Sequence, residues 1–133
     1  TNGLMPERLG PILEAGLADY VAMDVKAHYA KYAEITGVLL DPDKIKQSIE
    51  IIKNSCIDYE FRTTVVPTLH DEKDVEEMAK AIAGAKKFVL QQFVPDHTLD
   101  ERLRIISPYP KEKILALVET ARKHVPQTIA RGV

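Results

Sequence analysis

The sequence is poor in cysteine and has no long apolar run, and each absence excludes a class of protein. One cysteine in 133 residues rules out an internal disulfide, and Cys56 alone cannot bind an iron–sulfur cluster or a thiolate zinc site. The sequence contains no stretch of about 18 apolar residues, so no membrane span is predicted. The start also lacks the basic and apolar regions of a secretion signal. We therefore expect a cytoplasmic protein in which Cys56 is structural or incidental.

An excess of charge of one sign is missing as well. Lysine and arginine number 18 against 20 aspartate and glutamate, which argues against a nucleic-acid surface built on phosphate contacts. Hydrophobic residues make up 45% of the chain, enough for a core, so residues 1–133 are expected to form a single domain. The chain begins at Thr1 as though a strand had just ended, and we expect it to be a fragment of a longer protein.

Helix and strand patterns alternate along the sequence. The expected helices begin at Pro6 and Pro42 and cover 70–84 and 111–124; the expected strands are 20–26, 59–66, 88–93 and 127–131. This alternation predicts an α/β fold of parallel βα units with right-handed crossovers. Four such units are about half of an eight-stranded barrel, which takes about 250 residues. Part of a barrel is therefore the expected architecture.

Two of the apolar strands carry charge. Asp24 and Lys26 share one face at the end of the first strand, and Arg62 lies within the second. The apolar rows would pack on helices, and the charged rows would face the barrel interior or the concave side of an open sheet. Because parallel strands bind ligands at their C-terminal ends, the three side chains are expected to bind a zwitterionic or anionic ligand. A buried ion pair that satisfies itself is the alternative.

Other polar residues are expected at the same end of the sheet. Asn2-Gly3 has the composition of a turn, and Gln91 and Gln92 end the third strand, where their amides could reach a ligand or satisfy backbone groups. His97 follows in a loop, where we expect a solvated side chain. Pattern alone does not separate binding from structure at these positions.

Four segments, in this order and spacing, resemble the later strands of a radical S-adenosylmethionine (SAM) enzyme: "TNG", "DYVAMDVKA", "EFRTTVVP" and "VLQQFVP". Within that family the chain looks most similar to activases of glycyl-radical enzymes, of the kind that serve anaerobic ribonucleoside-triphosphate reductase or pyruvate formate-lyase. The resemblance covers nearly the whole chain. It implies that residues 1–133 are the C-terminal part of a partial TIM-type βα barrel, truncated here to about half.

The resemblance also implies a SAM site. Asp24 and Lys26 would contact the ribose and methionine portions of SAM, and Arg62 would contact SAM or its carboxylate. The strand in "VLQQFVP" would lie near the adenine and the substrate peptide. The implied cofactor-binding residues are Thr1, Asn2, Asp24, Lys26, Arg62, Thr64 and Gln92.

In the family, a Cys-x-x-x-Cys-x-x-Cys motif binds a 4Fe–4S cluster and a Gly-Gly-Glu-Pro stretch grips the SAM amino group; neither is in this sequence. The cluster reduces SAM to methionine and a 5'-deoxyadenosyl radical, which takes a hydrogen atom from a glycine of the partner enzyme. The resemblance thus implies that this chain supplies one wall of the SAM pocket and part of the docking surface for a glycyl-radical enzyme. The isolated chain would be inactive, since it lacks the cluster ligands.

Two alternatives stay open at this point. One is a non-catalytic fragment that binds SAM weakly or only packs, and that self-associates through an exposed sheet edge. The other is an unrelated βα-barrel enzyme in which Lys26 forms a Schiff base and Asp24 adjusts its reactivity.

Overall fold

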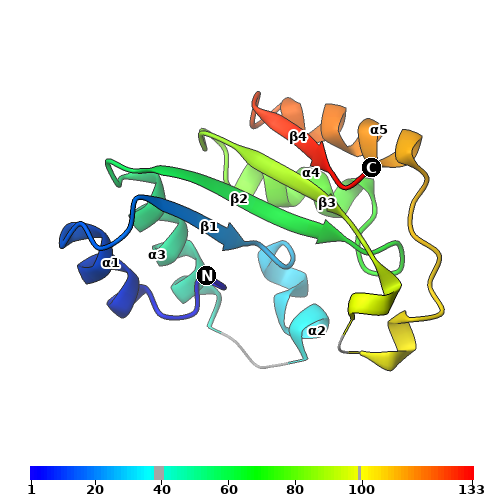
Figure 1. Ribbon diagram of the computed structural model, residues 1–133, viewed down its shortest axis with the longest axis horizontal. Coiled ribbons are helices and arrows are strands. Elements are labelled where there is room, and N and C mark those ends of the chain that lie inside the picture. The colour runs from blue at the N-terminus through cyan, green and yellow to red at the C-terminus, as the bar shows by residue number, and fades with distance from the viewer. Residues whose placement is uncertain (38–40, 99) are drawn as a thin grey trace.

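Helices and strands alternate in the computed structural model, which describes residues 1–37, 41–98 and 100–133 (Figure 1). The strands are β1 (Tyr20–Asp24), β2 (Asp58–Val65), β3 (Phe88–Gln92) and β4 (Thr128–Arg131). The α-helices are α1 (Pro6–Glu14), α2 (Tyr32–Thr36), α3 (Pro42–Lys53), α4 (Glu72–Ala81) and α5 (Lys111–Arg122). Short 3-10 helices η1 (Tyr29–Lys31), η2 (Pro95–His97) and η3 (Glu101–Leu103) lie in the connections. In these ranges no helix is both long and apolar enough to cross a membrane.

The four strands form one parallel sheet in the order β1-β2-β3-β4. Each strand pairs with the next along the chain, whereas a doubly wound sheet reverses its order partway. Sequential parallel pairing with helical connections is the pattern of a barrel wall. The predicted α/β fold and its partial-barrel architecture are confirmed.

The expected helix starts at Pro6, Pro42 and Lys111 are confirmed, whereas α4 begins at Glu72 and not at residue 70. The Asp41 side chain accepts a hydrogen bond from the Asp43 backbone at the start of α3, with Pro42 at the first helical position. At α4, Asp71 and Asp74 form a reciprocal capping box, each accepting from the other's backbone N–H. These caps satisfy backbone donors that the first turn of a helix leaves unpaired.

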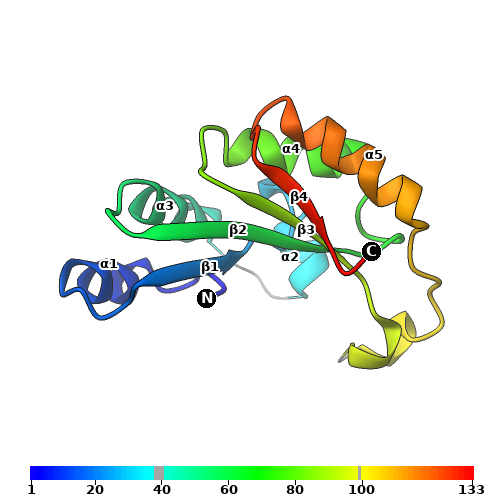
Figure 2. The ribbon, with the colours of Figure 1, turned by 45° about the horizontal axis from the view of Figure 1, so that its top comes forward.

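One face of the sheet forms the hydrophobic core. Val21, Met23, Phe61 and Leu90 point to this face and pack with apolar residues of α3, α4 and α5. The apolar stripe of α3 is part of it, with Ile45, Ile49 and Ile52 each at most 1% exposed. Figure 2 shows these helices gathered on one side of the sheet. In the described part of the chain no helix covers the other face, where the alternate residues lie.

The two outer strands differ at their free edges. Along β1, the Thr1 amino group donates to the Ala22 carbonyl at 2.7 Å, and the Asp24 N–H donates to the Thr1 carbonyl at 2.9 Å. This is the bonding of a parallel strand neighbour. Along β4, no neighbouring strand is found among the described residues. Self-association through an exposed edge stays a prediction.

Gly3 connects the N-terminal segment to the core. Its φ is 72°, its carbonyl accepts from the buried Ser48 hydroxyl at 2.7 Å, and a Cβ atom added there would lie 2.1 Å from the Met23 methyl carbon. Met23 is fully buried, so its side chain has little room to move away.

We expect Gly3→Ala to lower the free energy of unfolding by about 2 kcal/mol, because it adds a left-handed backbone penalty to an overpacked contact. Gly10→Ala is the control. Gly10 lies within helix α1, and among the described residues a Cβ atom there would meet only the Ile51 side chain of α3, at 3.9 Å. That change should leave stability unchanged or raise it slightly. Urea unfolding of both variants checks this, and equal effects would contradict the role given to Gly3.

Candidate functional site

Two adjoining cavities lie at the C-terminal ends of β1, β2 and β3. The larger, of about 640 Å³, is lined by Lys26, Thr64 and Gln92 among the predicted site residues. The smaller, of about 150 Å³, shares Lys26 and Thr64 with it and reaches Asp24 and Arg62. The structure therefore brings five of the seven predicted residues to one place.

Asp24 is at the centre of the charged group. Its carboxylate accepts a hydrogen bond from Arg62 Nε through one oxygen and lies 3.3 Å from Lys26 Nζ through the other. Partial burial raises the pKa of the Asp24 carboxyl, but the hydrogen bonds and positive charges of Arg62 and Lys26 outweigh it and leave the pKa below its usual value. One carboxylate thus pairs with two cations, and the group keeps one net positive charge.

Strand register explains why these side chains meet. Asp24 of β1 is directly paired with Arg62 of β2, so both side chains project from the uncovered face. Lys26 lies two residues past Asp24 and keeps the same side. An ion pair is therefore present, as in the alternative, but its side chains are about a third exposed and not buried, and its surplus charge lies beside a cavity.

The position of Lys26 disfavours a Schiff-base role. Such lysines react as neutral amines and are usually desolvated or placed beside another cation. Lys26 Nζ instead contacts the Asp24 carboxylate, and its side chain is 49% exposed.

Thr1 and Asn2 do not line either cavity. The Thr1 hydroxyl accepts from the Gly3 backbone at 3.2 Å, and the Asn2 side-chain oxygen accepts from the Leu4 backbone at 3.1 Å. These bonds are those of a plain turn. A ligand contact for either residue stays a prediction.

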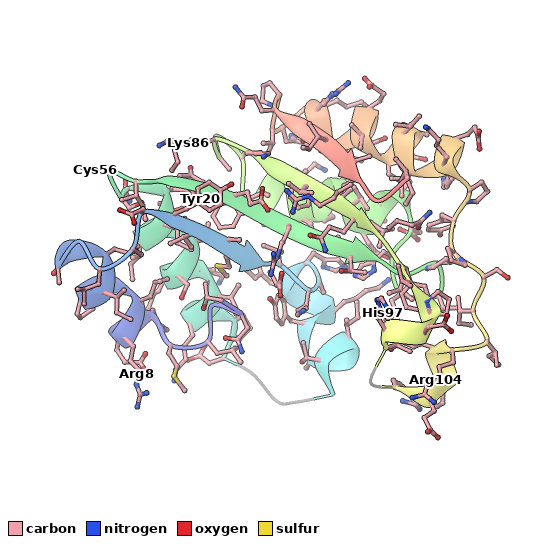
Figure 3. All side chains as sticks on the ribbon, viewed as in Figure 1. Arg8, Tyr20, Cys56, Lys86, His97 and Arg104 are labelled. Atoms are coloured by element: carbon pink, nitrogen blue, oxygen red, sulfur yellow. The ribbon has the colours of Figure 1, made fainter. Side chains whose placement is uncertain are left out.

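Gln92 and His97 both line the larger cavity, and a ligand contact for Gln92 stays a prediction. The Gln92 amide nitrogen donates to the Tyr109 carbonyl at 2.7 Å and its oxygen accepts from the Phe93 backbone, so the amide mainly satisfies backbone groups. His97, expected only as a solvated loop residue, is exposed but also lines the larger cavity. Figure 3 shows it at the opposite end of the sheet from Cys56 and Lys86.

Sequence reasoning missed a second charged group on the uncovered face, centred on Glu60. This side chain is 5% exposed and accepts hydrogen bonds from the two terminal guanidinium nitrogens of Arg131, Nη1 and Nη2, at 2.8 and 2.9 Å. The Tyr20 hydroxyl donates to it at 3.1 Å, and Lys87 Nζ lies 3.3 Å away. The hydrogen bonds of Arg131 dominate and lower the pKa of Glu60 to about 2, against the opposing effect of burial.

The Glu60–Arg131 pair links β2 to β4 across β3. Val89 of β3 projects from the uncovered face between them, yet it is fully buried, which the overlying ion pair accounts for. Arg131 also donates to the Gln91 side chain at 3.3 Å. The Glu60–Arg131 pair therefore connects β2 to β4 across the middle of the sheet, and it does not occupy the strand ends, where a ligand could bind.

The described residues do not fit an iron–sulfur cluster. Within ranges 1–37, 41–98 and 100–133, no three His, Cys, Asp or Glu side chains are placed to share a metal ion. The one cysteine, Cys56, is exposed, precedes β2 and does not line either of the two strand-end cavities.

The fold and the cavities define a partial βα barrel with a polar site at its strand ends. No family model matches the chain. A protein of Methanocaldococcus jannaschii, provisionally named a glycyl-radical enzyme activating enzyme, is 35% identical over 138 residues. That alignment covers all of this chain and 57% of the relative, so the chain spans little more than half the relative's length.

A solved structure shares the fold. The domain of a pyruvate-formate lyase-activating enzyme from Bacteroides vulgatus superposes with a TM-score of 0.71 at 13% identity, covering 95% of this chain and 74% of that one. The sequence match confirms the predicted resemblance to an activating enzyme of glycyl-radical enzymes, and the solved structure confirms the fold.

The Glu60 group predicts a specific acid sensitivity. Folding lowers the pKa of Glu60 from 4.5 to about 2. The ionised Glu60 carboxylate therefore contributes its full stabilisation at pH values above 4.5, the pKa in the unfolded chain, and this stabilisation is lost as the pH falls toward about 2. We expect Glu60→Gln to lower the free energy of unfolding by about 2 kcal/mol near neutral pH, with the difference shrinking in acid.

Asp58→Asn, on the same strand, is the control. The Asp58 side chain is 80% exposed and, among the residues that the structure describes, forms an ion pair only with Lys86, so its loss should change stability by less than about 0.5 kcal/mol. Urea unfolding at a series of pH values measures both variants. A Glu60→Gln deficit that stays constant down to about pH 3 would contradict the assignment.

Proposed function

We propose that residues 1–133 are the C-terminal part of a radical SAM barrel in a glycyl-radical enzyme activase, and that they supply one wall of its SAM pocket. The observation that carries the proposal is the Lys26–Asp24–Arg62 group, with its surplus positive charge beside a cavity. The name of the M. jannaschii relative and the likeness to a pyruvate-formate lyase-activating enzyme domain support it.

The chemistry of SAM suits this group. SAM carries a carboxylate, an ammonium group, a ribose diol and an adenine ring. Arg62 and Lys26 are suited to the carboxylate, because charge-assisted hydrogen bonds to it are strong. Asp24 accepts hydrogen bonds from either the ribose hydroxyls or the ammonium group.

The cavity offers the remaining contacts. Its volume of about 640 Å³ lies within the range of about 300–1,000 Å³ that is usual for small-molecule sites. Ile35, Val66 and Phe93 provide apolar surface for a purine, and the Thr64 hydroxyl and the Gln91 amide provide hydrogen-bonding groups.

In the whole protein, SAM bound to a reduced 4Fe–4S cluster would supply the radical chemistry, and this chain's residues would bind and orient SAM. The cluster ligands would come from outside residues 1–133. The partner would be a glycyl-radical enzyme of the ribonucleotide reductase or pyruvate formate-lyase type, presenting its glycine at the strand ends where the cavities open. The whole protein would be cytoplasmic.

We expect Arg62→Gln and Asp24→Asn to weaken SAM binding by the full-length protein about tenfold or more, because each removes a charged partner from the group. Equilibrium dialysis with SAM measures the affinity without relying on activity.

Arg104→Gln is the matched control. Arg104 lies in the connection after η3, does not line either cavity and pairs only with Glu101 among the described residues (Figure 3). SAM affinity should be unchanged in this variant. A folded wild-type protein that does not bind SAM, or an Arg62→Gln variant that binds it normally, would overturn the proposal.

A further inference from the structure

The backbone at the end of β1 is held by side chains. The strand was expected to continue to Lys26, but it ends at Asp24. The Val25 carbonyl accepts from the Thr63 hydroxyl at 2.7 Å. The Lys26 N–H then donates to the Tyr32 hydroxyl at 3.2 Å, and the Lys26 carbonyl lies 2.8 Å from His70 Nε2. Both backbone groups of Lys26 are therefore fixed by side chains from other segments.

His70 is suited to this contact by its tautomer. Its Nδ1 accepts from the Val66 N–H at 3.1 Å and so carries no proton. The proton is then on Nε2, which donates it to the Lys26 carbonyl. The side chain is almost completely buried, and the Tyr109 hydroxyl donates to the His70 carbonyl at 3.1 Å. The ring thus joins the end of β2 to the end of β1.

The surroundings of the ring favour its neutral form. Burial lowers the pKa of His70 below its usual value, and the charge of Lys31 acts in the same direction. The bond to the Lys26 carbonyl and the carboxylates of Asp74 and Asp71 oppose this without reversing it. A neutral ring keeps Nδ1 available as an acceptor for the Val66 N–H.

We propose that His70, together with the Tyr32 hydroxyl, is a positioning residue of the candidate site, because it fixes the backbone from which Lys26 reaches Asp24 and the cavity. The inference rests on the proposed SAM site. The Lys26 side chain is long and half exposed, with one salt bridge at 3.3 Å, so its own contacts define its place only weakly. Its direction is set by the backbone that His70 and Tyr32 hold.

Two substitutions separate the roles of the ring nitrogens. In His70→Gln the amide group extends to the position of Nε2 and can still donate to the Lys26 carbonyl. In His70→Asn the shorter amide can accept from the Val66 N–H in place of Nδ1 but cannot reach Lys26. A purely structural role in the Val66 turn would thus favour Asn, whereas positioning of Lys26 favours Gln.

We expect the full-length His70→Gln protein to bind SAM within about threefold of wild type and His70→Asn to bind about tenfold more weakly, when measured by equilibrium dialysis. Circular dichroism and urea unfolding show that both variants are folded. Equal affinities for the two variants, or tighter binding by His70→Asn, would overturn the inference. The proposed function would still stand in that case, provided that the wild-type protein binds SAM.

Two further results complete the test. If folded wild-type protein does not bind SAM, the proposed function fails and the inference fails with it. If both His70 variants are unfolded, Tyr32→Phe provides the measurement, since it removes only the hydroxyl that accepts from the Lys26 N–H. Several-fold weaker SAM binding by Tyr32→Phe supports the inference, and unchanged binding overturns it.

Discussion

The parallel register between β1 and β2 is the constraint on which the rest of the structure depends. Side chains alternate across a strand, so pairing Asp24 with Arg62 also turns Met23 and Phe61 to the helix-covered face. A shift of one residue would bury the charges and expose the core. The same pairing therefore stabilises the domain and assembles the charged site at its strand ends.

The two charged groups on the uncovered face differ in burial, and this separates their roles. Glu60 is almost fully buried, but two cations and a hydroxyl satisfy it, so its cost of desolvation is offset by partners fixed within the sheet. Asp24 and Arg62 are each about a third exposed and border a cavity, with one cation in excess. Both groups hold one carboxylate and two cations, so their charge does not separate them. They differ in burial, and the second group borders the strand-end cavity in which we propose that SAM binds.

The sequence predicts those features that depend on local periodicity. The helix caps, the apolar stripe of α3 and the convergence of Asp24 with Arg62 all follow from spacing within single elements and from the rule that parallel strands share an edge. The Glu60–Arg131 pair does not follow, because its members are 71 residues apart and meet only through the order of the strands. His70 does not follow either: the pattern places it in the expected helix 70–84, whereas it lies in the connection before α4, and a connection has no periodicity that reveals which backbone group a side chain meets.

The end of β1 illustrates why a binding site departs from a regular strand. In a regular ladder the backbone of Val25 would pair with β2, and that of Lys26 would face the other edge of β1, the edge on which Asp24 meets Thr1. The Val25 N–H still donates to the Arg62 carbonyl of β2 at 2.9 Å. Side chains from β2, α2 and the β2–α4 connection then bind the Val25 carbonyl and both backbone groups of Lys26, so these backbone polar groups are satisfied where the strand ends. Lys26 lies there at the boundary of both cavities. A buried, neutral histidine suits such a junction, because one planar ring can accept from one strand end and donate to the other at a fixed separation.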